Sequence, residues 1–158
     1  MQFVSPDDFL QKPGFINIPE LFNPSGFSLP FAPSILSKTA KLVEEKEKVR
    51  FHTLELVFVD EHEIQQINRK YLNKEYITDI ISFRYDDRNN SAIEATLYCC
   101  APRIAEQAAE FSTGLKQEFL RVYIHGLLHV AGYRDDTRDQ KKSMSKLEND
   151  YLQLFDEQ

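Results

Sequence analysis

Three polar side chains recur at four-residue intervals in an otherwise apolar segment of this 158-residue chain. They are Arg121, His125 and His129. Four residues turn an α-helix by about 400°, so neighbouring members are offset by only about 40° and all three share one face. Two imidazoles one helical turn apart can hold a metal ion. Because an unpaired buried polar group costs about 1–3 kcal/mol, we expect the histidines to have a partner, and zinc is a common one.

The residues after this segment predict a third ligand. Gly132 follows the last apolar turn, where helices commonly end with a glycine in the left-handed conformation. A chain that reverses there brings Asp135 toward the two histidines. Two imidazoles and one carboxylate leave the fourth position of a zinc ion to water or substrate, as catalytic sites require. Asp136 remains an alternative third ligand.

Gly126 distinguishes this pattern from that of the helical zinc peptidases. Those enzymes carry H-E-x-x-H, in which the glutamate is the general base. A glycine at the glutamate position has no side chain that takes a proton, so the spacing favours hydrolytic zinc chemistry other than peptidase chemistry. Alternatively, Gly126 allows close packing of the helix against a strand.

The histidines fall in a predicted helix over residues 115–131 that is apolar on nearly every side, which is typical of a buried central helix. Prolines and capping-box residues begin further helices, and β-branched runs predict strands. The helices are expected over residues 33–47 and from residues 60, 102 and 137, and the strands over residues 52–59, 78–85 and 92–100. The last two strands are expected to form an antiparallel hairpin across a polar turn at residues 86–91.

Apolar side chains at helical spacing are expected to face the core. They are Ile35, Leu36, Ala40 and Val43; Ile64, Ile67 and Tyr71; Ile104, Ala108 and Phe111; and Met144, Leu147, Tyr151, Leu154 and Phe155. The first 33 residues are rich in proline and glycine, which predicts loops and one short strand near Phe27–Leu29. Few strands and several helices predict an α+β fold, with a small mixed β-sheet packed against several helices, in a single domain over residues 1–158.

The composition excludes several classes of protein. The net charge is −6, which argues against a protein that coats nucleic acid through a basic face. No window approaches the roughly 20 apolar residues of a membrane span, and the first residues lack the pattern of a secretory signal. Cys99 and Cys100 are adjacent and poorly placed to bridge each other, so we expect a cytoplasmic protein without a disulfide scaffold. Either cysteine is an alternative zinc ligand that would close a structural site.

Two segments resemble the conserved blocks of a known family. HGLLHVAGYRDD, at residues 125–136, resembles the H-G-x-L-H-L-x-G-Y-x-H signature of the YbeY family of bacterial ribosomal-RNA maturation endoribonucleases. NRKYLNKEYITDIISF, at residues 68–83, resembles the family's N-x-x-Y stretch that leads to T-[ND]-[VI]-[LI]-[ST]-F. The resemblance extends over about residues 52–155. It implies a compact α+β domain, one Zn²⁺ ion, and metal-dependent RNA cleavage in ribosomal RNA maturation and ribosome quality control.

The chain departs from the family pattern at three places. The third family ligand is a histidine, and Asp135 stands there instead, which zinc accepts. An arginine that the family uses for activity is replaced by Leu72, and the family's G-D-I stretch is replaced by residues 95–97. The resemblance therefore implies that another cation contacts the phosphate.

Several side chains are candidates for contacting an RNA substrate. Arg121 is the candidate catalytic cation, with a salt bridge beneath the helix as its alternative role. Candidate substrate-binding residues are Arg69, Lys70, Ser82 and Arg84. Tyr71, Tyr85 and Tyr133 are candidates for stacking on bases, or else amphipathic residues at the edge of the core.

Three functions remain open on the sequence alone. The leading hypothesis is a zinc-dependent endoribonuclease, in which His125, His129 and Asp135 hold the ion and the partner is RNA, in or near the ribosome. The second is a zinc hydrolase of another substrate, such as a peptide or a small phosphoester. The third is a non-enzymatic ribosome assembly factor in which zinc only braces the fold. The sequence leaves open which RNA is bound and the oligomeric state.

Overall fold

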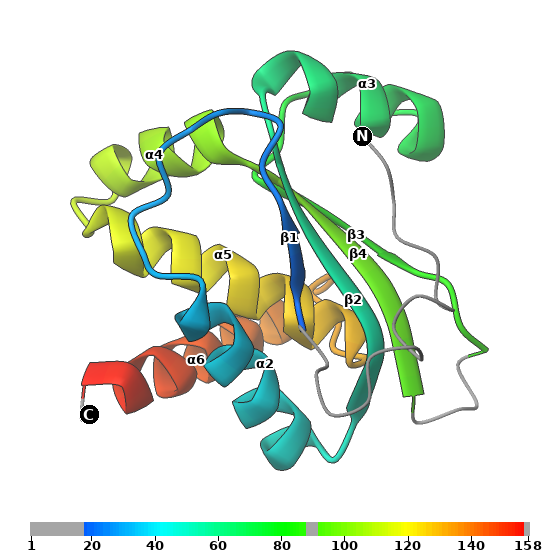
Figure 1. Ribbon diagram of the computed structural model, residues 1–158, viewed down its shortest axis with the longest axis vertical. Coiled ribbons are helices and arrows are strands. Elements are labelled where there is room, and N and C mark those ends of the chain that lie inside the picture. Colours follow the sequence, from blue (N-terminus) through cyan, green and yellow to red (C-terminus); the bar gives the residue numbers. More distant parts are fainter. Residues whose placement is uncertain (1–17, 88–91, 157–158) are drawn as a thin grey trace.

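The computed structural model describes residues 18–87 and 92–156, which form a four-stranded mixed sheet with helices packed around it (Figure 1). In sheet order the strands are β1 (Glu20–Phe22), β2 (Arg50–Val59), β4 (Ala92–Cys100) and β3 (Ile80–Arg84). The first three run parallel, and β3 pairs antiparallel with β4 as the expected hairpin. The helices are α2 (Ser34–Glu47), α3 (Glu61–Leu72), α4 (Ala101–Glu110), α5 (Leu115–Val130) and α6 (Arg138–Asp156). The predicted α+β class is confirmed.

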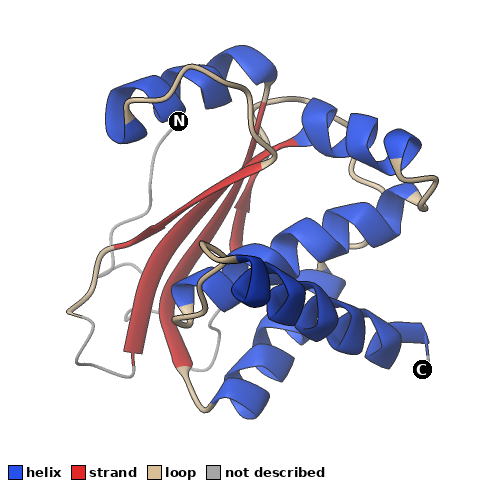
Figure 2. Cartoon of the chain, turned by 180° about the vertical axis from the view of Figure 1, so that it is seen from behind, coloured by secondary structure: helices blue, strands red, loops and turns tan. Residues whose placement is uncertain are grey.

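The two faces of the sheet pack against different helices. Because neighbouring strand residues point to opposite faces, Leu54 and Leu56 of β2 join the larger core cluster with α2, α4, α5 and α6. Val57 and Val59 join a smaller cluster with Ile64 of α3. Figure 2 shows α5 and α6 on the same side of the sheet, with α3 apart at one end.

Helix α5 is the buried centre of the larger cluster, as its apolar sequence predicts. The Tyr123 hydroxyl lies within it and donates to the carbonyl oxygen of Leu36 at 2.8 Å. Gly126 faces the sheet, where a β-carbon would lie 2.5 Å from Cδ1 of Ile80 and 3.2 Å from Cδ1 of Leu97. The glycine therefore allows α5 to pack closely on β3 and β4, which is the packing role weighed above.

Both predicted capping boxes begin helices. The Asp60 side chain accepts from the Glu63 amide at 2.8 Å at the start of α3. Before α6, the Gln140 amide donates to Thr137 Oγ1 and the Thr137 amide donates to Gln140 Oε1, both at 3.1 Å. These contacts satisfy amides that have no partner within the helix.

The strand expected near Phe27–Leu29 is wrong, because these residues form a loop and the short strand is β1. Side chains form hydrogen bonds with the backbone groups that a strand would use to pair with its neighbour. Asn23 Nδ2 donates to the Phe27 carbonyl at 2.8 Å, and the Phe27 amide donates to Ser25 Oγ at 3.1 Å. Phe27 packs on the core through its ring, 5.9 Å from the ring of Phe119.

Two aromatic residues expected in the core are exposed. Tyr71 is 59% exposed and Phe111 is 62% exposed. Phe111 follows the last residue of α4, so the helical spacing no longer determines its direction. Tyr71 lies in the last turn of α3, and the buried residues on that helix are Ile64 and Asn68. The expectations for residues 1–17, and for residues 88–91 of the turn, fall outside the described residues.

Candidate metal centre

The turn after α5 returns the chain toward the histidines. The Gly132 amide donates to the His129 carbonyl and the Tyr133 amide to the Leu128 carbonyl, both at 3.0 Å, and Gly132 has a φ of +117°. This pair of hydrogen bonds is a Schellman motif, which needs a residue that tolerates positive φ. The predicted glycine stop is therefore confirmed, and Asp135 follows within reach of the helix.

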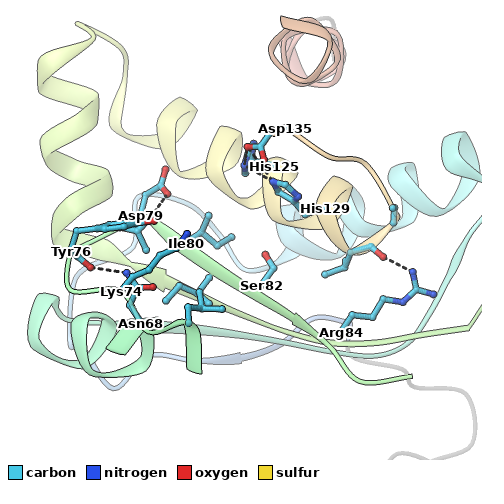
Figure 3. A pocket seen from close by; sticks show the side chains of 16 residues that line it. Asn68, Lys74, Tyr76, Asp79, Ile80, Ser82, Arg84, His125, His129 and Asp135 are labelled. Atoms are coloured by element: carbon cyan, nitrogen blue, oxygen red, sulfur yellow. Dashed lines mark hydrogen bonds and ion pairs between the residues drawn. The ribbon is translucent and has the colours of Figure 1, made fainter. Parts of the chain in front are cut away.

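Three ligand atoms converge at this point (Figure 3). The Nε2 atoms of His125 and His129 are 3.0 Å apart, and Asp135 Oδ2 lies 3.5 Å from the first and 3.4 Å from the second. Bonds of about 2.0–2.1 Å in a tetrahedral zinc site place the ligand atoms about 3.3–3.4 Å from one another. The three side chains therefore fit a single small ion. Asp136 instead pairs with Arg134 at 2.6 Å.

The ligand set remains open on one side. The side chains of His125, His129 and Asp135 are between 26% and 33% exposed. Cys99 and Cys100 are buried and free in β4, and neither belongs to the cluster. Three protein ligands with an accessible fourth position are typical of catalytic rather than structural zinc sites.

Glu148 of α6 orients the first histidine and was not anticipated from the sequence. The Nδ1–H of His125 donates to Glu148 Oε2 at 2.7 Å. A proton on Nδ1 leaves the lone pair of Nε2 directed at the cluster, which is the usual arrangement of histidine ligands. The carboxylate is buried, 6% exposed. Its sequence signal is an acid on the apolar stripe of α6, four residues after Met144 and three before Tyr151.

The neighbouring carboxylates also change the acidity of His125. Burial favours the neutral ring and lowers its pKa. The hydrogen bond to Glu148 and the charges of Glu148 and Asp135 outweigh burial, so the pKa stands above its ordinary value of 6.5. Protons therefore compete with a metal ion for this ring at a higher pH than they would for a free histidine.

The zinc affinity of the chain is expected to fall as the pH is lowered from about 8 to about 6. Only the neutral imidazole binds metal, and a raised pKa means that the loss begins above pH 6.5. Competition with a chromophoric chelator, corrected for the chelator's own protonation, measures this dependence. An affinity that stays constant over the range contradicts it.

The cluster lies in a cleft of about 740 Å³ between α5, β3 and the segment that joins α3 to β3. Ser82 and Arg84, two of the candidate substrate-binding residues, line this cleft. Arg84 is held by two hydrogen bonds to Asp86, at 2.9 and 3.0 Å, and donates to the Val130 carbonyl at 2.8 Å. It therefore fixes the end of α5 against β3.

Three of the predicted cations lie outside the cleft. Arg121 donates to Asn149 Oδ1 at 2.7 Å and is 3.4 Å from Glu148 Oε1, the salt-bridge role weighed above. Arg69 pairs with Glu75 at 2.9 Å, and Lys70 lies over the ring of Tyr71. The cleft-lining cation that sequence reasoning missed is Lys74.

The fold and the cluster define an α+β protein in which three side chains could hold a metal ion at an open cleft. The model of the family "Endoribonuclease YbeY" matches residues 30–156. The chain belongs to this family. Among the described residues, no helix is both long enough and apolar enough to cross a membrane.

Curated relatives agree with this assignment. An endoribonuclease YbeY of Ureaplasma urealyticum is 40% identical over 107 residues, covering 67% of this chain and 68% of the relative. That of Chlorobium limicola is 36% identical over 123 residues, covering 78% and 84%. A solution structure of a Thermotoga maritima protein matches with a TM-score of 0.55 and 25% identity, covering 85% of each chain.

Proposed function

We propose that the chain is a zinc-dependent endoribonuclease that acts in ribosomal RNA maturation and ribosome quality control in the cytoplasm. The observation that carries this proposal is the convergence of His125, His129 and Asp135 at an open cleft in a chain of the endoribonuclease YbeY family. Two imidazoles and a carboxylate suit zinc. When bound, zinc supplies a Lewis acid that polarises a phosphoryl oxygen or makes water more acidic.

The side chains of the cleft have distinct parts in this reaction. His125 and His129 hold the ion through Nε2, and Asp135 adds a negative ligand. Glu148 keeps the His125 proton on Nδ1 and so fixes the orientation of the ring. Ser82, on β3 in the same cleft, offers a hydroxyl to the RNA. Arg84 holds the end of α5 in place through the Val130 carbonyl.

The proposal is tested by cleavage of RNA with and without the metal. The zinc-loaded chain is expected to cut a labelled ribosomal RNA fragment, to lose this activity in a chelator, and to regain it when zinc is restored. A peptide library incubated in parallel is expected to stay intact. Cleavage of peptides alone would indicate a hydrolase of another substrate. Zinc binding without cleavage of either would indicate an assembly factor with a bracing ion.

A further inference from the structure

Two lysine–tyrosine pairs stand near the C-terminal end of α3. Lys70 lies 5.1 Å from the centre of the Tyr71 ring, and Lys74 lies 5.7 Å from the centre of the Tyr76 ring. The exposure of the two rings is also similar, at 59% for Tyr71 and 55% for Tyr76. They differ in location, because Lys74 and Tyr76 line the cleft that holds the metal cluster and the other pair does not.

The segment that carries the second pair is held in place by α3. The buried Asn68 donates from Nδ2 to the Tyr76 carbonyl at 2.8 Å, and its own carbonyl accepts from the Lys74 amide at 3.2 Å. Gln65 Nε2 donates to the Glu75 carbonyl at 2.9 Å. These bonds use only backbone atoms of the segment. The side chains of Lys74 and Tyr76 remain exposed, while the bond from Asn68 to Tyr76 holds the backbone in place (Figure 3).

Lys74 is the basic side chain of the cleft that is available to a substrate. The basic side chains that line it, apart from the two histidines, are Lys74 and Arg84. Arg84 is engaged by Asp86 and by the Val130 carbonyl. Within residues 18–87 and 92–156, no acidic side chain is in ion-pair contact with Lys74. Its contact with the Tyr76 ring is exposed and worth only about 0.5–1 kcal/mol, so the ammonium group moves to a phosphate at small cost.

We propose that Lys74 and Tyr76 form a nucleotide-binding subsite for the RNA substrate, beside the metal ligands. The Lys74 ammonium group pairs with one phosphate, and the Tyr76 ring stacks on an adjacent unpaired base. Stacking on an exposed aromatic ring together with a phosphate contact is how proteins hold single strands. The proposal rests on the proposed function, in that it identifies residues that bind the same RNA. It also gives the cleft an accessible cation two residues after Leu72, which lines the same cleft.

The test measures RNA binding separately from cleavage. Fluorescence anisotropy of a labelled, unstructured twelve-nucleotide RNA is recorded in a chelator, with Lys74→Ala, Tyr76→Ala and Tyr76→Phe compared with the unchanged chain. Tyr76→Ala is expected to weaken binding about tenfold and Tyr76→Phe less than about twofold, because the ring remains. Lys74→Ala is expected to weaken binding about fivefold and to reduce the slope of log Kd against log salt by about 0.7, the value for one phosphate contact on a single strand.

Lys116→Ala and Phe111→Ala are the controls, because both side chains are exposed, neither lines the cleft and neither is a candidate for contacting the RNA. Both are expected to bind the RNA within about twofold of the unchanged chain. In the zinc-loaded chain, the Lys74 and Tyr76 variants are expected to raise KM for RNA more than they lower kcat.

The outcomes separate this proposal from the proposed function. RNA cleavage in which the Lys74 and Tyr76 variants change Kd and KM no more than the control variants do overturns the subsite and leaves the nuclease standing. Binding that depends on Lys74 and Tyr76 without any cleavage by the zinc-loaded chain supports the subsite and contradicts the nuclease. A chain that neither binds nor cleaves the RNA overturns both.

Discussion

Replacing His129 by alanine is expected to abolish zinc binding and RNA cleavage together. The substitution leaves only His125 and Asp135 of the three-residue cluster to bind the ion. Removing a residue that only hydrogen-bonds to a ligand already lowers metal affinity about 10–100-fold. Removing a ligand itself is therefore expected to lower it more than about 100-fold. Metal content after dialysis against buffered zinc, measured beside the cleavage rate, checks this result.

His62→Ala is the control for the His129 substitution. His62 is an exposed histidine of α3, and its contact is with Gln66 at 2.9 Å. It is expected to keep its full zinc content and cleavage rate. If His129→Ala keeps one equivalent of zinc, the cluster of His125, His129 and Asp135 is not the metal site. If it loses zinc and still cleaves RNA, the cleavage does not depend on this ion.

Replacing Glu148 by alanine is expected to weaken zinc binding about 10–100-fold without changing a single ligand. The His125 Nδ1–H loses its acceptor at 2.7 Å, so the ring is no longer fixed with Nε2 toward the cluster. Glu148→Gln retains an oxygen that accepts this hydrogen bond and is expected to lose less. Zinc affinity is measured by chelator competition, and cleavage is measured at saturating zinc, where the alanine variant is expected to recover part of its activity.

Asp150→Ala is the matched control on α6. Asp150 is an exposed acid that pairs with Lys146 at 3.2 Å, a surface contact worth at most about 1 kcal/mol. It is expected to bind zinc as the unchanged chain does. Equal zinc affinities for Glu148→Ala and Asp150→Ala would show that Glu148 serves α6 packing or the pair with Arg121 rather than the metal ligands.

The sequence predicts the cluster of His125, His129 and Asp135 because the information that brings these side chains together is local. His125 and His129 share a helix face through their spacing, and the turn at Gly132 needs only the conformational freedom of one residue. The structure then brings Asp135 to 3.4 Å from His129, so the expected cluster forms. The small mixed sheet and its antiparallel hairpin follow in the same way from short segments with clear periodicity.

The features that the sequence does not predict depend on contacts between distant segments. Glu148 reaches His125 only because α6 packs on α5, which no spacing within α6 reveals. Lys74 reaches the cleft because Asn68 holds the segment after α3, so the cation lies four residues beyond the expected Lys70. The wrong strand at Phe27–Leu29 has a different, local cause, because hydrogen bonds with the side chains of Asn23 and Ser25 favour a loop there.

Gly126 influences the shape of the cleft through the Ile80 side chain. Helix α5 carries the histidines on one wall, and β3 carries Ser82 on the other. Ile80 lies over Gly126 and also lines the cleft, so the two walls meet where a β-carbon would be. A β-carbon at 126 would lie 2.5 Å from Cδ1 of Ile80, so a larger residue there would displace the Ile80 side chain. The room for a substrate on this side of the cleft thus depends on position 126, although Gly126 itself does not line the cleft.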